Sequence, residues 1–117
     1  MSLQECYAAI GGDFEGILGR LGSEKLVERF ALKFLADGSY PSLIKAMEEE
    51  NYEDAFRAAH TLKGVGMNLG FTGLHEASDL LTEALRGGNK PADDTLLDKV
   101  KAEYEKTVAA LKEYQGA

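Results

Sequence analysis

The most informative segment of the chain is Ala58-Ala59-His60-Thr61-Leu62-Lys63-Gly64, which Gly70-Phe71 follows after one further helical turn and a half. Apolar residues recur around it at the three- and four-residue spacing that is typical of an amphipathic helix. They gather on one side of the helical projection, with Ala59 and Gly66 at the margin: Ala55, Ala58, Leu62, Val65 and Leu69. The pattern predicts a helix from about Glu53 to Leu69 that buries this side.

His60 falls on the opposite side of the same helix. A helix turns by about 100° per residue, so five residues lie near His60 in projection: Phe56, Arg57, Lys63, Gly64 and Met67. Because none of the core positions is among them, we expect the His60 side chain to face solvent.

The histidine, lysine and glycine that lie beside one another here are suited to phosphoryl transfer. An exposed histidine is largely neutral and nucleophilic at neutral pH. Lys63, three residues on, reaches the same side and can pair with phosphate oxygens. Gly64 costs a helix about 1 kcal/mol relative to alanine, which suggests that a phosphate or a partner's backbone approaches closely there. The segment thus predicts a helix that presents a histidine to a phosphoryl group carried by another protein.

Simpler interpretations of each residue stay open. Most exposed histidines only titrate, an exposed lysine is usually a solvated charge, and a glycine within a helix often serves packing. Phe56 and Met67 are apolar groups on a face expected to be polar, which suggests docking of a partner. For Phe56, partial burial by a neighbouring helix explains the pattern equally well. Arg57 could pair with an acidic partner or be a solvated charge.

Composition narrows the class of protein. The chain has 117 residues, 44% of them hydrophobic, which is enough for one domain with a packed core. Its formal net charge of −7 argues against nucleic acid as a partner. Cys6 is the only cysteine, so no intrachain disulfide or thiolate metal cluster is expected. No signal peptide pattern and no stretch of about 20 apolar residues is present, and we expect a cytoplasmic protein that does not enter a membrane.

Every periodic segment of the chain indicates a helix. Glycines and caps divide the sequence into the following expected helices: Leu3 to Ile10, Asp13 to about Gly22, Glu24 to Ala36, about Pro41 to Glu50, Glu53 to Leu69, Thr72 to Arg86 and about Asp93 to Tyr114. In the third of these, Phe30 is assigned to the apolar side. Short turns between the last three helices favour antiparallel neighbours. The expected fold is all-α, an up-and-down antiparallel four-helix bundle with short additional N-terminal helices. Residues 1–117 form a single domain, with the short helices in 1–22 and the bundle in 23–114.

The chain resembles histidine phosphotransfer domains, known as HPt domains, from about Asp13 to Tyr114. The resemblance is carried by residues 56–64 together with Asn68-Leu69-Gly70-Phe71, and more weakly by residues 29–37 and 52–55. It implies that His60 is the phosphorylated residue, Lys63 the cation that faces the phosphate, and Gly64 the small residue beneath the phosphoryl group. It also implies receiver domains of response regulators and a hybrid sensor histidine kinase as partners. No cofactor is expected, because Mg²⁺ would come with the receiver's acidic pocket.

One position departs from a branch of this family. HPt modules of chemotaxis kinases carry a glutamate on the next helix that orients the imidazole, and the matching position here is Thr82. The neighbouring Glu83 is expected to face elsewhere. A hydroxyl is a weaker partner for an imidazole N–H than a carboxylate. The departure favours the relay type of HPt domain, which receives phosphate from an aspartate rather than directly from an ATP-binding domain.

Other classes of function are less well supported. A metal-binding bundle would carry Glu-x-x-His pairs, but Arg57 precedes His60 by three residues and Thr72 precedes His75 by three. No nucleotide-binding motif is present, so kinase activity is not expected. A nucleophilic enzyme would need an oxyanion site that the sequence does not indicate. The main alternative is a non-catalytic helical module that binds receiver domains without transferring phosphate.

Overall fold

The computed structural model describes residues 1–116, and within them the chain is helical with no strand. The helices follow one another in this order: α1 (Leu3–Ile10), α2 (Phe14–Leu21), α3 (Glu24–Lys33), the short 3₁₀ turn η1 (Phe34–Ala36), α4 (Ser39–Glu48), α5 (Tyr52–Leu69), α6 (Thr72–Leu85) and α7 (Thr95–Gly116). The all-α class predicted from the sequence is confirmed.

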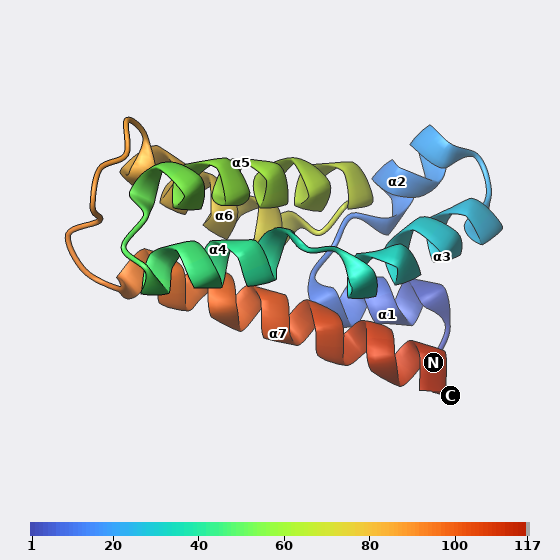
Figure 1. The fold of residues 1–117 in the computed structure, drawn as a ribbon. Helices are drawn as coiled ribbons and strands as arrows, with labels where there is room; N and C mark the ends of the chain where they lie inside the picture. Colours follow the sequence, from blue (N-terminus) through green and yellow to red (C-terminus); the bar gives the residue numbers. More distant parts are fainter. Residues whose placement is uncertain (117) are drawn as a thin grey trace.

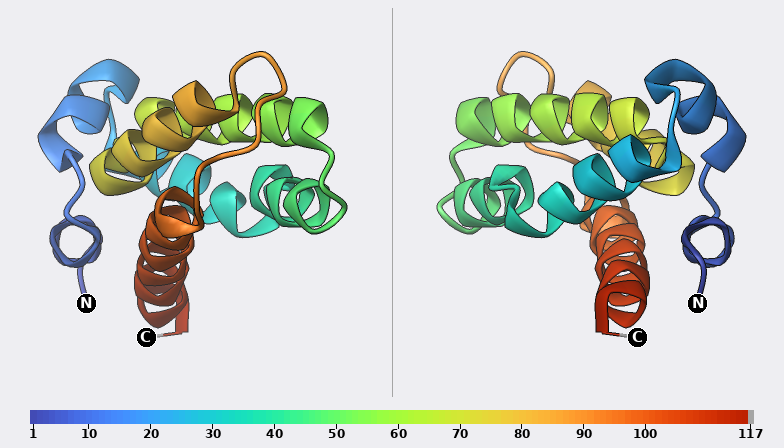
Figure 2. Two further views of the ribbon diagram at one scale, coloured as in Figure 1. Left: turned by 90° about the vertical axis from the view of Figure 1, so that its left-hand side faces the viewer. Right: turned by 90° about the vertical axis from the view of Figure 1, so that its right-hand side faces the viewer.

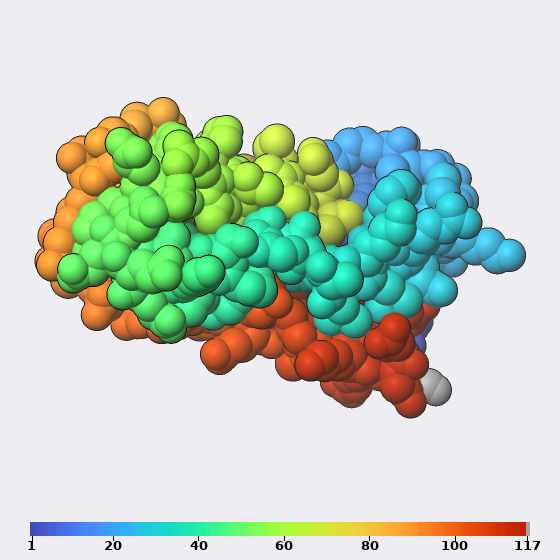
Figure 3. Space-filling model, in the orientation of Figure 1, coloured from blue at the N-terminus to red at the C-terminus, as the bar shows by residue number. Residues whose placement is uncertain are grey.

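The last four helices form the bundle. Each of α4, α5 and α6 packs against the helix that follows it, and successive helices run in opposite directions (Figure 1). The bundle is closed by aromatic contacts between α4 and α7, where the rings of Tyr40 and Tyr104 stack 3.7 Å apart. On the face shown in Figure 3, α4 and α5 cover the left and centre, α2 and α3 cover the right, and α7 runs along the lower edge. The predicted up-and-down antiparallel arrangement is therefore present.

The ends of the helices are fixed by capping residues. Ser2, Asp13, Ser23 and Asn51 each accept a hydrogen bond from a backbone N–H in the first turn of the helix that follows. At the C-terminus of α5, Gly70 adopts a φ of 74°, a left-handed conformation that most side chains disfavour. Only Phe71 then separates it from α6. The tight turn places α6 directly against α5, which positions the residues described below.

The two N-terminal helices pack against the bundle rather than extending away from it. α1 lies alongside the C-terminal half of α7, and α2 lies near the C-terminal end of α5 (Figures 1 and 2). The Tyr7 hydroxyl on α1 donates a hydrogen bond to the Leu69 carbonyl, and Arg20 on α2 donates to the carbonyls of Met67 and Asn68. These bonds add partners to carbonyls in the last turn of α5, where the Met67 carbonyl also accepts a hydrogen bond from the Gly70 N–H.

Three details differ from the sequence prediction. α4 begins at Ser39, where the Asp37 carboxylate accepts a hydrogen bond from the Ser39 N–H, and so it starts two residues before Pro41. The connection between α6 and α7, residues 86–94, is longer than the short turn expected. Phe30 is 38% exposed instead of facing the core, because Val27 and Ala31 are the residues of α3 that are buried there.

No helix among the described residues is both long enough and apolar enough to cross a membrane.

Candidate functional site

His60 lies in the middle of α5 with its side chain exposed, as the helical projection predicted. Its ring is nearly parallel to that of Phe56, one turn earlier, with an angle of 8° between the planes and 6.0 Å between the centroids. Within residues 1–116, no hydrogen bond to another protein group involves the His60 ring. Both ring nitrogens are therefore free to meet a partner molecule.

Phe56 is half-buried because α6 covers part of it. The Arg86 guanidinium, at the end of α6, lies 5.2 Å from the centre of the Phe56 ring, in the geometry of a cation–π contact. Arg86 is held in turn by Glu83, through hydrogen bonds of 3.1 Å from Nε and 2.7 Å from an NH₂ group. Of the two interpretations left open for Phe56, partial burial by a neighbouring helix describes it better than full exposure. The ring that supports His60 is thus itself fixed from α6.

Lys63 also contacts α6. Its ammonium group lies 2.8 Å from a carboxylate oxygen of Asp79. The hydrogen bond from Lys63 is the main cause of a lowered pKa of the Asp79 carboxyl. One turn earlier on α6, the Nδ1 atom of His75 lies 3.1 Å from the Lys63 carbonyl oxygen. His75 is partly buried at this helix contact.

Gly64 has open space around it. A methyl group placed on Gly64 would meet no atom within 4 Å beyond its immediate neighbours and the adjacent turns of its own helix backbone. Gly66 is the opposite case, since a methyl group there would lie 3.1 Å from the backbone nitrogen of His75. Gly66 is the packing glycine of this helix. The interpretation of Gly64 as a packing device is therefore wrong, and clearance beside His60 remains as a reason for it.

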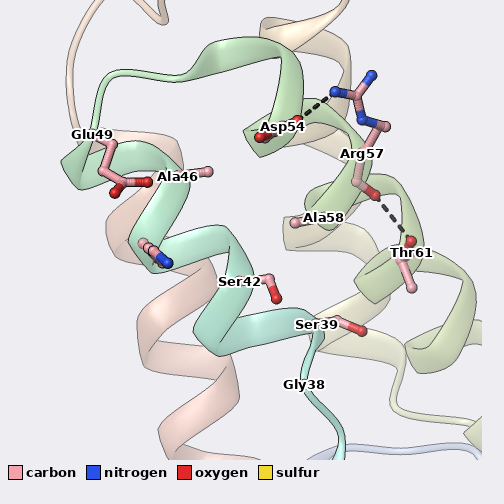
Figure 4. A pocket seen from close by; sticks show the side chains of 10 residues that line it. Gly38, Ser39, Ser42, Ala46, Glu49, Asp54, Arg57, Ala58 and Thr61 are labelled. Atoms are coloured by element: carbon pink, nitrogen blue, oxygen red, sulfur yellow. Dashed lines mark hydrogen bonds and ion pairs between the residues drawn. The ribbon is translucent and has the colours of Figure 1, made fainter.

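Arg57 is exposed on the side of α5 that faces α4. It forms an ion pair with Asp54, and its carbonyl accepts a hydrogen bond from the Thr61 hydroxyl (Figure 4). These residues line an open groove whose other wall comes from α4: Gly38, Ser39, Ser42, Lys45, Ala46 and Glu49. His60 is thus flanked by this groove on one side and by the contacts with α6 on the other.

Met67 is the exposed apolar residue of this face, with 51% of its surface accessible. It lies two turns after His60 on α5. Arg20 of α2 binds its carbonyl oxygen, so the backbone is fixed while the side chain stays accessible. Met67 is exposed, as expected for a docking residue, whereas Phe56 is only partly exposed.

The Thr82 hydroxyl is directed to the backbone of its own helix and not to the His60 ring. Thr82 is fully buried, and its hydroxyl donates a 2.6 Å hydrogen bond to the Ser78 carbonyl within α6. Glu83 was expected to face elsewhere, but this is wrong in part. Its carboxylate holds Arg86 over Phe56, and its pKa is lowered mainly by the Arg86 hydrogen bond and also by the charge of Lys63. The side of α6 nearest the site therefore carries Asp79, Glu83 and Arg86 and not Thr82.

The charges around His60 are balanced. Three cations surround it, and each is paired with a carboxylate: Arg57 with Asp54, Lys63 with Asp79 and Arg86 with Glu83. The surroundings of His60 therefore differ from those of an anion-binding pocket, in which several unpaired cations point at one place. Among residues 1–116, no three metal-binding side chains lie close enough together to hold a metal ion.

The sequence was also compared with models of known protein families. The family model described as "Hpt domain" matches residues 31–113, which span the end of α3, all of α4, α5 and α6, and most of α7. The chain belongs to the Hpt domain family. Membership associates it with histidine phosphotransfer in phosphorelays, which involve receiver domains and kinases. No curated protein and no solved structure that was compared with the chain gave a match.

The Hpt domain contains two groups near His60 that the sequence alone did not indicate. Asp79 is sixteen positions after Lys63 in the printed sequence, and no spacing rule pairs residues on different helices at that separation. Arg86 was assigned only as the end of a helix. Its ion pair with Glu83, three residues earlier, is a recognisable helical spacing and could have been found. Its position over Phe56 depends on how α6 packs on α5, which only the folded structure shows.

Proposed function

We propose that this Hpt domain relays a phosphoryl group between the aspartates of receiver domains, with His60 as the residue that carries it. The observation that supports this most strongly is the exposed imidazole, free of protein hydrogen bonds, on a well-packed helix of a chain in this family. Phosphoryl transfer depends mostly on positioning and charge stabilisation, so an accessible and rigidly mounted nucleophile is what the carrier must contribute.

In the proposed step, the lone pair of the outer ring nitrogen, Nε2, attacks the phosphorus of a receiver's aspartyl phosphate. The N–P bond forms as the P–O bond to the aspartate breaks, and the bonding electrons leave with the aspartate carboxylate. Nδ1 keeps its proton, so the product is a phosphorylated imidazolium ring. Reversal of the same step onto a second aspartate completes the relay. No oxidant, reductant or nucleotide is needed.

The residues beside His60 have supporting roles in this proposal. Lys63 offsets charge on the phosphoryl oxygens as they arrive. Gly64 leaves room for the phosphoryl group and for the receiver's active-site loops. Phe56 and Arg86 hold the imidazole plane in place of the hydrogen-bonded glutamate of chemotaxis modules. Mg²⁺ would be supplied by the receiver's acidic pocket.

Docking is assigned to the surface around the histidine. Met67 offers an apolar contact, and Phe56 offers the edge that Arg86 leaves uncovered. Arg57, beside the α4–α5 groove, can exchange its pairing with Asp54 for an acidic group on the partner. The proposed partners are receiver domains of response regulators and of a hybrid sensor histidine kinase. We place the exchange in the cytoplasm, in keeping with an acidic chain that has a single cysteine.

The alternative is a module that binds receivers without accepting phosphate. Incubation with a receiver domain labelled on its aspartate distinguishes the two. Acid-labile and base-stable label on this chain supports the relay, whereas a stable complex without label supports binding alone. His60→Gln is the control, because an exposed side chain can be replaced with a change in stability of about 0.5 kcal/mol or less.

A further inference from the structure

The ion pair between Lys63 and Asp79 differs from the two others around His60. Arg57–Asp54 and Arg86–Glu83 are pairs within one helix, three residues apart, and their side chains are more than half exposed. Lys63–Asp79 joins α5 to α6, and the Lys63 side chain is only 27% exposed. The cation three residues from the proposed phosphoryl acceptor is thus engaged by a carboxylate from the neighbouring helix.

We propose that Asp79 controls how strongly Lys63 stabilises the phosphohistidine, and thereby how readily His60 passes its phosphoryl group on. This inference rests on the proposed function, since it concerns the phosphorylated form of His60. Asp79 is a positioning residue in this account: it acts through Lys63 and does not touch the reacting atoms.

The argument is electrostatic. An ammonium group has three N–H donors, and one is used by Asp79, so Lys63 can bind a phosphoryl oxygen without leaving the carboxylate. The carboxylate nevertheless cancels much of the lysine's charge, so a dianionic phosphoryl group beside Lys63 is stabilised less than it would be beside an unpaired lysine. A phosphohistidine beside a paired lysine is therefore less stable than one beside a free lysine. For a carrier that must release what it accepts, this lower stability favours onward transfer.

Asp79 is suited to a test by substitution. Like an ordinary aspartate it is ionised at neutral pH, and the Lys63 hydrogen bond lowers its pKa further. Its side chain is 43% exposed, and such ion pairs contribute little to folding. Asp79→Asn keeps the size of the side chain and removes only its charge. A change in phosphoryl chemistry can therefore be separated from unfolding, which a thermal melt of the same variant would detect.

The experiment measures how phosphoryl groups partition between this protein and a receiver domain. The receiver is charged with acetyl phosphate, freed of the reagent and mixed with wild-type protein or with Asp79→Asn. At equilibrium, we expect the ratio of phosphohistidine to phosphoaspartate to rise about twofold to tenfold in the variant, because an unpaired Lys63 attracts the dianionic phosphoryl group more strongly at this range. An unchanged or lower ratio would overturn the inference.

Two controls test whether the effect passes through Lys63. In the background of Lys63→Gln, Asp79→Asn should change the ratio much less, and an undiminished change there would contradict the proposed coupling.

Glu76→Gln removes the same charge from the side of α6 that faces α7, and it should leave the ratio near that of the wild type. A rise as large as that of Asp79→Asn would show that only net charge matters. If the wild-type protein itself exchanges no phosphate with any receiver tested, the proposed function fails, and that result is distinct from an unresponsive Asp79.

Discussion

Two glycines of α5 that are only two positions apart have different surroundings. Gly64 is open to solvent space, whereas Gly66 lies against the backbone of His75. At Gly64, alanine should be neutral or should stabilise the helix by up to about 1 kcal/mol. At Gly66, the same change should destabilise the protein, because overpacking against backbone costs about 1–3 kcal/mol. Thermal unfolding of both variants checks this contrast.

A larger side chain at Gly64 tests whether this glycine is needed for phosphoryl acceptance rather than for folding. Gly64→Gln should fold normally and accept phosphate poorly, since its side chain would occupy the space beside His60. If this variant folds and is phosphorylated at the wild-type rate, the steric role of Gly64 is wrong. If it fails to fold, the open surroundings of Gly64 are wrong instead.

Met67 and Leu80 are exposed to nearly the same extent, 51% and 49%, but lie on different faces. Met67 is on the His60 side of α5, and Leu80 lines a hollow between α6 and α7. We expect Met67→Ala to weaken receiver binding by several-fold, in the range of about 1 kcal/mol found for many interface contacts. Leu80→Ala should leave it unchanged. Titration of a labelled receiver with each variant measures the difference, and equal effects would argue against docking through the His60 face.

At the level of single residues, the sequence predicted which side chains of α5 are exposed, but it did not predict which side chains of α6 they contact. Helical spacing correctly placed His60 and Met67 on the exposed side of α5. It could not show that Asp79 engages Lys63 or that Arg86 covers Phe56, because both contacts depend on the rotation of α6 about its own axis. The helical projection of one element has no information on the side chains of another.

Within the elements, α5 is delimited at both ends by residues with local roles. Asn51 caps its N-terminus by accepting a hydrogen bond from the Asp54 N–H, and Gly70 ends it in a left-handed conformation. The sequence predicted the C-terminal end at Leu69, and the predicted start at about Glu53 lies one residue after the observed start at Tyr52. Such helix boundaries are hard to predict because several polar residues lie close together, here Asn51, Glu53 and Asp54, and the sequence does not show which of them caps the helix.

The turn before α5 contains a residue under strain. Glu50 has a φ of 55°, in the left-handed region that costs most side chains about 1–2 kcal/mol. It also follows the end of α4, where negative charge is disfavoured by the helix dipole. Glu50→Asn should therefore stabilise the protein by up to about 1 kcal/mol, because asparagine adopts this conformation more readily. Chemical denaturation checks the sign, and destabilisation would show that the strain is not relieved by this change.

At the scale of the whole molecule, α1 is joined to the His60 helix through Tyr7. The Tyr7 ring is buried between Phe14 and Phe71, and its hydroxyl donates to the Leu69 carbonyl. Burial raises the pKa of this hydroxyl, so it stays protonated and remains a donor throughout the physiological range. α1, which lies outside the family match, is thereby attached to the end of α5.

Tyr7→Phe tests this attachment. It keeps the ring and removes one hydrogen bond, which should cost about 1 kcal/mol of stability, or somewhat more if the Leu69 carbonyl is left without a partner. Phosphoryl acceptance should be unaffected, because the site is supported locally by α6. The measurements are urea unfolding and the labelling assay described above. A loss of labelling without a loss of stability would show that α1 influences the site directly.

The overall arrangement could be predicted because its causes are local. Periodic apolar residues, glycines such as Gly70 and the tight connections before and after α5 together specify antiparallel neighbours. The packing of α1 and α2 onto α5 could not be predicted in the same way. It depends on contacts such as Tyr7 with Leu69 and Arg20 with Met67, which join residues more than forty positions apart in the sequence.

The central claim is that His60 carries the phosphoryl group on a ring nitrogen, and locating the phosphate tests it most directly. The protein is phosphorylated by a charged receiver domain, digested at neutral to basic pH and mapped by tandem mass spectrometry. We predict phosphate on the peptide that contains His60, with a ³¹P signal of a phosphoramidate, and none in His60→Gln. Phosphate on His75 or on a carboxylate, or labelling that persists in His60→Gln, would contradict the account.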